Sequence, residues 1–474
     1  MVLNQQKNIF SYNSKYFYFD ISLIIFFIFN IVWVLFDSFE PSFQFIQYIN
    51  LFEYSFLFGI DGISIFFIYL STFLIPLCLL FSFYNMKQKG VSEVKMYQSF
   101  LFLTLFLLIF VFSALDILVF YIMFEIILIP FFVLIGVSSY RKRRIHASYL
   151  FFFYTLVGSF LMLISIFSLY SFTGTSNIEV LLNNQYSFYR ENIVWLTFFI
   201  SFAIKIPMFP AHIWLPEAHV EAPTEGSVLL AGVLLKLGSY GFLRFLMPLF
   251  PNSTYYYSPL VILIACLGIF YTSFVTLKQI DIKRIIAYSS VSHMNVCILG
   301  LFTFHSLGIA GSIHLMIAHG LVSGGLFFLV GMLYNRHHTK LLKYYSGLVY
   351  TMPLFSFFFF IFIISNISFP LTSNFIGEFL IIVGLFLSFN YYALFFTLVG
   401  VFICTVYSLW LYNKLVFMIP KYQYIKYYND LSFLECSLLF IILFFVLWLG
   451  IYPYSIFSIL DTSINYYYFD LLYK

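Results

Sequence analysis

Charged residues are scarce in this sequence of 474 residues. Asp, Glu, Lys and Arg make up 9% of it and hydrophobic residues make up 62%, whereas a soluble domain has about 25% charged residues. This composition excludes an ordinary soluble domain. Apolar runs recur from about residue 20 to residue 457 with short loops between them. They indicate an all-α polytopic membrane protein, because a helix satisfies its own backbone hydrogen bonds within a bilayer.

Patterned cysteines and nucleotide-binding motifs are also lacking. The five cysteines stand singly with no C-x-x-C spacing, at Cys78, Cys266, Cys297, Cys404 and Cys436. This scatter argues against a disulfide framework, a zinc site or an iron–sulfur cluster. The sequence has no dinucleotide-binding fingerprint. We therefore expect no cofactor, no metal and no electron transfer in this chain.

The N-terminal residues lack a targeting signal. The segment MVLNQQKNIFSYNSKYFYFD has neither the short apolar core of a cleaved signal nor the Arg-rich, acid-poor pattern of a transit peptide. If the chain is mitochondrial, we expect it to be made inside the organelle. We divide the sequence into a polar leader at 1–19, one transmembrane domain at 20–457 and a short tail at 458–474.

About thirteen membrane-spanning helices are predicted. They cover about 20–37, 62–84, 97–114, 116–138, 147–172, 193–216, 226–248, 258–277, 284–303, 307–333, 350–388, 391–413 and 432–457. The sixth and the eleventh contain proline and polar residues in their middle. Because an interior proline removes a backbone hydrogen bond, we expect the helices at 193–216 and 350–388 to be discontinuous.

The distribution of Lys and Arg predicts the orientation, because short loops on the inner side of a membrane hold most of the cations. With the N-terminus inside, the inner segments carry Lys7, Lys15, Lys87, Lys89, Lys95, the run RKRR at 141–144, Lys278, Lys283, Arg284, Arg336, Lys340, Lys343, Lys414, Lys421 and Lys426. The outer segments carry Arg190 and Lys474. We therefore place the N-terminus inside and the C-terminus outside, and we interpret RKRR as a topology anchor rather than a nucleic-acid patch.

One inner loop departs from this rule. The segment HIWLPEAHVEAPTEG at 212–226 contains three Glu and two His but no Lys or Arg. Titratable groups without cations are typical of a mouth that collects protons. The acids can equally serve to begin the next helix, since Thr224 to Ser227 also has the pattern of a helix start. The sequence leaves both interpretations open.

Few ionisable residues lie at membrane depth. They are Glu125, Lys205, Lys236 and Glu378, with the histidines His293, His314 and His319. An acidic group at the centre of a span costs roughly 2.5 to 3.5 kcal/mol. Each residue alone has a structural explanation, because a buried Glu can be neutral and a Lys near a helix end can reach the interface. The whole set is better explained by proton transfer.

The residue types also suggest how a proton would move. A buried lysine tends to lose its proton, and a nearby carboxylate restores its charged form. A Glu and Lys pair can therefore turn a small movement into proton transfer, while histidines and water carry the proton onward. Lys205 and Glu378 both lie on the predicted discontinuous helices, one in each half of the chain. This arrangement is typical of transporters built from inverted repeats.

Four sequence blocks resemble the antiporter-like, proton-pumping subunits of NADH:ubiquinone oxidoreductase (respiratory complex I), and its chain 4 family in particular. They are KIPMFPAHIWLPEAHVEAPTEGSVLLAGVLLKLGSYGFLRF (205–245), QIDIKRIIAYSSVSHMN (279–295), MIAHGLVSGGLFFLVGMLYNR (316–336) and NFIGEFLI (374–381). The likeness runs from about residue 60 to residue 457. An acid at Glu378 fits chain 4, whereas lysine is usual at that position in chain 2, and chain 5 continues into a long lateral helix.

The resemblance implies a set of site residues. Glu125 and Lys205 match the family's paired Glu and Lys, and Lys236 matches its central lysine. His293 and His319 match its linking histidines, and Glu378 matches its terminal residue toward the outer half-channel. These six residues are the expected relay for protons that cross the membrane while NADH is oxidised and quinone is reduced elsewhere in the complex.

The resemblance also implies location and partners. It implies a multi-pass protein of the mitochondrial inner membrane, next to chain 2 and chain 5 type subunits, accessory subunits and lipids, with no nucleic acid. NAD, FMN, iron–sulfur clusters and ubiquinone are expected in partner subunits.

Three features depart from the family pattern. The family usually has fourteen helices, and we expect the polar leader at 1–19 to stand in place of the first. Phe124 stands before Glu125 where the family commonly has Trp, and the break before Glu378 has the sequence SFPLTSNFIGEF. None of these differences removes an ionisable residue from the predicted relay.

Two other functions are compatible with parts of the sequence. A subunit of an Mrp-type antiporter would exchange Na⁺ for H⁺ and would lack flavin and iron–sulfur partners. A degenerate subunit would only scaffold the membrane arm, but the four charged residues at membrane depth argue against that alternative.

Overall fold

The computed structural model describes residues 2–51, 54–85, 91–138, 143–421 and 429–473. The first half of the chain contains α1 (Val2–Leu35), β1 (Gln44–Leu51), β2 (Tyr54–Ile60), α2 (Ser64–Asn85), α3 (Val91–Ser113), α4 (Ile117–Ile126), α5 (Leu128–Ser138), α6 (Arg143–Thr173), α7 (Ile178–Asn183), α8 (Phe188–Lys205), α9 (Trp214–Glu221) and α10 (Thr224–Leu229). Two π-helical segments follow, η1 (Leu230–Leu234) and η2 (Phe242–Leu246), which flank α11 (Leu235–Gly241) and lead into α12 (Met247–Leu249).

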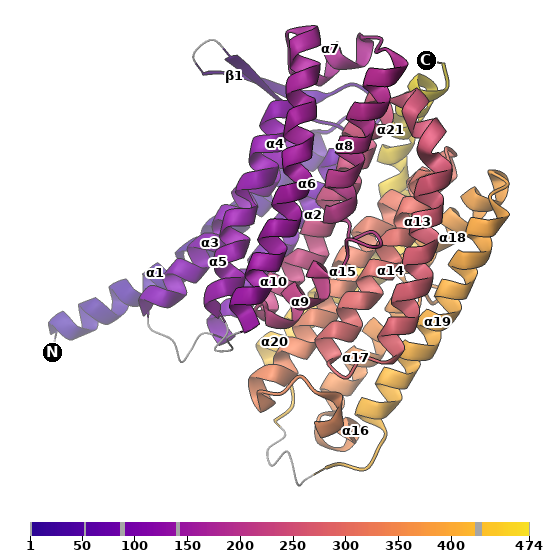
Figure 1. The fold of residues 1–474 in the computed structure, drawn as a ribbon. Coiled ribbons are helices and arrows are strands. Elements are labelled where there is room, and N and C mark those ends of the chain that lie inside the picture. The colour runs from indigo at the N-terminus through magenta and orange to yellow at the C-terminus, as the bar shows by residue number, and fades with distance from the viewer. Residues whose placement is uncertain (1, 52–53, 86–90, 139–142, 422–428, 474) are drawn as a thin grey trace.

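The second half is also helical. It contains α13 (Pro251–Leu277), α14 (Ile282–Leu301), α15 (Ser306–His337), the 3-10 turn η3 (Leu342–Tyr344), α16 (Leu348–Thr351), α17 (Pro353–Asn366), α18 (Ser373–Leu387), α19 (Tyr391–Val416), α20 (Phe433–Ile451) and α21 (Tyr454–Tyr473). Figure 1 shows these helices as one bundle with near-parallel axes.

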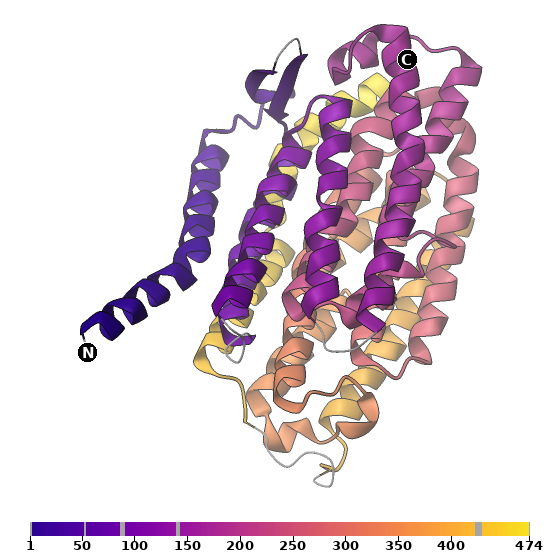
Figure 2. The same cartoon turned by 60° about the vertical axis from the view of Figure 1, so that its left-hand side comes forward.

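The helices agree with the predicted membrane class. Ten helical segments among the described residues are long and apolar enough to cross a membrane. The more polar α8 and α14 and the short pair α17 and α18 occupy the other predicted spans, so each of the thirteen overlaps a helix or a helix pair. The start of α1 and the end of α21 lie toward opposite ends of the bundle (Figures 1 and 2), and the predicted orientation of the chain in the membrane stays a prediction.

Both predicted breaks are present. Helix α8 ends at Lys205, and residues 206–213 form turns before α9 begins at Trp214. The carbonyls freed by this break find donors, since Met208 N–H bonds to Ala203 O at 2.9 Å and Trp214 Nε1 bonds to Ile204 O at 2.9 Å. Such compensation is what allows irregular backbone within a bilayer. In the same way, residues 367–372 separate α17 from α18.

Other elements differ from the sequence predictions. Strands β1 and β2 form an antiparallel hairpin, so the transmembrane domain is not purely helical. Residues 2–19 of the predicted leader belong to α1. Most of the predicted tail at 458–474 belongs to α21. The fourth span is divided at Ile127, two residues after Glu125, because Pro130 has no N–H to donate to the preceding turn.

Helix α15 forms the centre of the bundle. It is buried along its length and packs against α14, α17, α18 and α20. The contact with α18 is close because glycines meet there. A Cβ atom on Gly377 would lie 2.8 Å from Leu315 Cα, and one on Gly311 would lie 3.0 Å from Gly377 O. Small residues are the usual means by which membrane helices approach closely, and here they bring α15 against the helix that carries Glu378.

Candidate functional site

Lys236 lies within the composite helix α10–η1–α11–η2. Its side chain is fully buried, and Nζ donates to Ala231 O at 2.5 Å. Ala231 belongs to η1, and π-helical segments inside α-helices occur often at functional sites. The same ammonium group lies 3.1 Å from His319 Nδ1 on α15. Lys236 is therefore held between one backbone carbonyl and one imidazole.

Two histidines continue the contacts from Lys236 across the bundle. The ring centroids of His319 and His293 are 5.5 Å apart. His293 Nδ1 on α14 then lies 2.9 Å from Glu378 Oε1 on α18. All four side chains are buried. The structure thus brings four of the six predicted relay residues into one line, Lys236–His319–His293–Glu378, which we call the central line.

Three further residues surround the far end of the central line. His293 Nε2 lies 3.8 Å from Cys404 Sγ on α19, and the Tyr407 hydroxyl donates to that sulfur at 3.0 Å. The Cys404 thiol in turn donates to Asn366 O at 3.6 Å, where α17 ends. The sequence analysis missed Cys404 and Tyr407, because a single Cys or Tyr in an apolar run has no pattern.

Glu125 and Lys205 form a looser pair. Lys205 Nζ lies 4.1 Å from the centroid of the Phe124 ring, a cation–π distance. Glu125 Oε1 and Lys205 Nζ are both buried atoms without a hydrogen-bond partner, and the two residues interact electrostatically. Phe124, which stands where the family commonly has Trp, thus supplies the aromatic face that the ammonium group contacts.

The composite helix packs directly against the end of α8. A Cβ atom on Gly238 would lie 2.9 Å from Phe202 O and 2.6 Å from Ile206 Cγ1. No other residue fits there without a shift of the backbone. The glycine therefore brings the helix of Lys236 against the helix that ends in Lys205.

The acidic segment 212–226 is mostly helical, and cations reach it from elsewhere. Lys283 Nζ donates to Ala222 O at 3.1 Å, Lys340 Nζ donates to Val220 O, and Arg284 pairs with Glu217 at 2.5 Å. These three cations come from the start of α14 and from the loop after α15. The segment itself has no Lys or Arg, but cations from other parts of the chain contact it. Counting Lys and Arg loop by loop could not reveal these contacts.

Glu225 and His219 lie on the buried side of this segment. Glu225 is in the first turn of α10, as the helix-start interpretation requires, and its carboxylate accepts from Tyr97 Oη at 2.9 Å. His219 stacks on Phe327 with centroids 4.7 Å apart, and neither ring nitrogen has a hydrogen-bond partner. His219 also interacts electrostatically with Lys283 and with Lys236 of the central line.

A buried ion pair was not anticipated. Arg244 on η2 donates to Asp61 at 2.7 Å and 2.9 Å through two nitrogens, and its Nε donates to Tyr240 Oη at 3.1 Å. Both charged side chains are about 1% exposed. The pair ties the composite helix to the start of α2. The sequence does show opposite charges at the ends of two apolar runs. It does not show that these two residues, 183 positions apart, form a pair.

His314 lies away from the central line. Its ring stacks on Phe457 of α21 with centroids 5.4 Å apart, and both ring nitrogens are buried without a hydrogen-bond partner. Among the described residues, no group of three or more His, Cys, Asp or Glu side chains is placed to hold a metal ion.

Comparisons with known proteins identify the family. Residues 114–404 match the family model described as NADH:quinone oxidoreductase/Mrp antiporter, TM. The chain is 48% identical to NADH-ubiquinone oxidoreductase chain 4 of Marchantia polymorpha over 447 residues, which cover 94% of this chain and 89% of that protein. It is also 48% identical to the chain 4 of Acanthamoeba castellanii over 462 residues, with 95% and 90% covered.

Two solved structures have the same fold. A chain of respiratory complex I from Thermus thermophilus with bound NADH matches with a TM-score of 0.86 and 28% identity, covering 95% of this chain and 94% of that chain. A chain of the Mrp complex from a Dietzia species matches with a TM-score of 0.85 and 17% identity, covering 97% and 93%. The second likeness concerns the fold alone. On the extent of the sequence matches, this chain belongs to the chain 4 family of NADH-ubiquinone oxidoreductase.

Proposed function

We propose that this chain is a membrane-arm subunit of NADH:ubiquinone oxidoreductase and that it translocates protons through the six predicted residues. The observation that carries the proposal is the central line, in which Lys236, His319, His293 and Glu378 follow one another through the buried middle of the bundle. Ionisable groups at this depth are costly and mark ion or proton pathways.

Each residue of the central line has a separate role. Lys236 receives a proton and holds it at Nζ, where Ala231 O and His319 are its neighbours. His319 and His293 carry the proton onward, because each imidazole can accept at one nitrogen while it donates at the other. The 5.5 Å between the ring centroids makes a reorientation or a bridging water necessary for this step. Glu378 accepts from His293 and releases the proton toward the outer side.

Glu125 and Lys205 act as a switch beside the central line. Since Lys205 has no hydrogen-bond partner and faces an aromatic ring, its charge depends on the electric field of nearby groups. When Glu125 comes closer, Lys205 stays charged and repels a proton at Lys236. When Glu125 moves away or is neutralised, Lys205 loses its proton and Lys236 can be charged. The close packing at Gly238 keeps the two lysine helices together during this change.

The acidic segment is the proposed entry. Glu217 and Arg284 are partly exposed, whereas Glu225 is buried. A proton taken up near the exposed carboxylate would pass Glu225 and His219 before it reaches Lys236. This path supports the proton-collecting interpretation of 212–226, although Glu225 also begins α10.

The proposal includes the chemistry of the partners. NADH oxidation, with FMN and iron–sulfur clusters, and quinone reduction belong to other subunits, so the energy for proton transfer arrives through protein contacts. The expected neighbours are the chain 2 and chain 5 type subunits, with accessory subunits and lipids. The expected location is the mitochondrial inner membrane, with synthesis inside the organelle.

Two substitutions test the relay. Lys236→Ala and Glu125→Ala should each abolish NADH-driven proton pumping while the complex still assembles, because each removes an ionisable group and leaves the helices in place. Pumping is measured with a pH-sensitive dye in vesicles that contain the purified complex, and assembly is measured on a native gel. Wild-type pumping in both variants would contradict the relay.

Because the fold resembles a chain of the Mrp complex, one alternative function remains, that of a subunit that exchanges Na⁺ for H⁺. The same vesicles distinguish the two functions. Proton movement that requires NADH and is unchanged by Na⁺ supports the complex I function, whereas Na⁺-dependent exchange without NADH supports the antiporter.

A further inference from the structure

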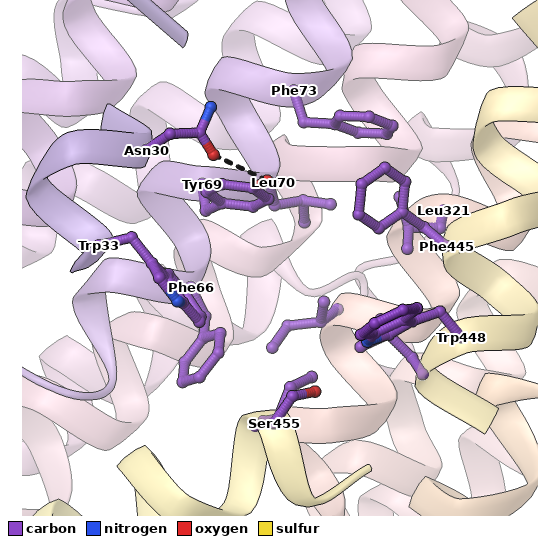
Figure 3. Close-up of a pocket in the computed structure, with 13 residues that line it drawn as sticks. Asn30, Trp33, Phe66, Tyr69, Leu70, Phe73, Leu321, Phe445, Trp448 and Ser455 are labelled. Atoms are coloured by element: carbon purple, nitrogen blue, oxygen red, sulfur yellow. Dashed lines mark hydrogen bonds between the residues drawn. The ribbon is translucent and has the colours of Figure 1, made fainter. Parts of the chain in front are cut away.

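An apolar cavity of about 330 Å³ lies between α1, α2, α15, α20 and the start of α21. Figure 3 shows Trp33 and Phe66 on one side of it, Phe445 and Trp448 on the other, and Ser455 at its edge. Leu321 of α15 also lines it. The cavity is thus walled by aromatic rings from helices far apart in the sequence.

Asn30, Tyr69 and Ser455 already have hydrogen-bond partners, and the indole N–H groups of Trp33 and Trp448 are the other polar side-chain groups of the lining. Asn30 Oδ1 accepts from Tyr69 Oη at 3.2 Å, and Asn30 Nδ2 donates to Phe26 O at 3.0 Å. The Ser455 hydroxyl donates to Tyr452 O at 3.1 Å. A buried water needs two to four polar partners, and these side chains have few hydrogen-bonding groups to spare. The cavity therefore suits an apolar occupant.

The surroundings of the cavity point to the membrane as the source of that occupant. Four of the five helices that form it are among the segments long and apolar enough to span a bilayer. Trp448 is 48% exposed, so part of the lining of the cavity is open to the surroundings of the bundle. Helix α1 packs against α2 and α3 and is otherwise largely exposed. An empty cavity between such helices would lose dispersion contacts along its whole lining.

We propose that this cavity binds one hydrocarbon chain of a membrane lipid, which fills the space between α1 and α20. A helix of a neighbouring subunit is the other apolar candidate. Membrane helices approach one another through Gly, Ala, Ser and Thr, whereas the lining contains no Gly or Ala and a single Ser, and its walls are large rings. Such walls fit a thin, flexible chain better than a cylinder of about 10 Å diameter.

This inference depends on the chain spanning a membrane and not on the proton relay, so either can fail alone. The experiment uses the intact complex in vesicles of phosphatidylcholine that carries a diazirine in the middle of one acyl chain. After a detergent wash that removes loosely bound lipid, the complex is illuminated and the adducts are mapped by mass spectrometry. We expect them on Trp33, Phe445 or Trp448, in excess over Phe440, which is 61% exposed on the same helix α20.

Variants that fill the cavity provide the controls. Leu321→Phe fills the cavity from α15, and Ser455→Phe fills it from α21. The Ser455→Phe variant is used if the complex with Leu321→Phe does not assemble. Each should lower the cavity adducts about tenfold or more, while Phe440→Leu should leave them unchanged. Equal labelling of Phe440 and the cavity would overturn the proposal. So would adducts that persist in the filled variants, or a photoreactive residue at Trp448 that captures a neighbouring subunit.

Discussion

The two groups of predicted relay residues are built differently. In the central line each ionisable side chain has a neighbour at contact distance, from Lys236 at 3.1 Å from His319 to His293 at 2.9 Å from Glu378. In the other group, Glu125 Oε1 and Lys205 Nζ have no hydrogen-bond partner, although both are buried. The central line thus has two close contacts, with 5.5 Å between the His319 and His293 ring centroids, whereas no hydrogen bond joins Glu125 to Lys205 and Glu125 bonds to Ser159 instead.

This difference corresponds to the two tasks that a pump must separate. A path must be connected, since a proton moves only between groups within hydrogen-bond reach or across one water. A switch must have two states, whereas a pair held by short hydrogen bonds has only one state. The break of α4 and α5 at Ile127 and the end of α8 at Lys205 place both members of the pair at helix ends, where small movements are easiest.

The largest expected effect comes from cutting the central line in its middle. His293→Ala removes the group that faces both His319 and Glu378, and it should slow proton transfer by about 100-fold or more. NADH-driven pumping in vesicles measures this loss. Cys404→Ala is the matched control, because Cys404 contacts His293 from outside the line and its loss should preserve most pumping. If the two variants pumped equally well, the central line would not be the path.

A structural charge pair should behave in the opposite way. Asp61→Ala leaves Arg244 charged and buried, which should lower stability by about 3–5 kcal/mol. It leaves every residue of the central line in place. Thermal unfolding of the purified complex, with hydrogen exchange of η2, measures the effect. Glu217→Ala breaks the more exposed pair with Arg284 and should cost at most about 1 kcal/mol. Equal losses of stability would show that burial does not set the strength of these pairs.

The smallest expected effect concerns the reach of the switch. Glu125→Asp keeps the charge but shortens the side chain, so the field at Lys205 weakens without vanishing. Pumping should fall by about three- to tenfold, since a change of 1.4 kcal/mol in the interaction is tenfold. The effect is measured as the rate of proton pumping at a given rate of NADH turnover. A variant with wild-type pumping would mean that the pairing with Lys205 is unimportant.

The sequence was sufficient to predict the class of fold and the candidate residues. Apolar length and proline positions predicted the spans and the breaks at 206–213 and 367–372, because these effects are local. The grouping of Lys236, His319, His293 and Glu378 was expected from the family resemblance. Their contacts, however, follow from how α11, α14, α15 and α18 pack.

Other features could not be predicted, because they depend on residues distant in the sequence. The partners of Lys283 and Lys340 are backbone carbonyls of the acidic segment, and no loop count reveals them. The hairpin β1–β2 lies between two spans and had been treated as a loop, although its Tyr, Phe and Ile content favours strands.

The most direct test of the central claim is the number of protons pumped per electron by the intact complex carrying Glu378→Gln. Glutamine keeps the size of the side chain and can still bond His293, so a purely structural role would survive, but it cannot release a proton. If Glu378 releases the proton, NADH-driven pumping is lost in this variant while the complex assembles normally. An unchanged number of protons per electron would contradict this role of Glu378.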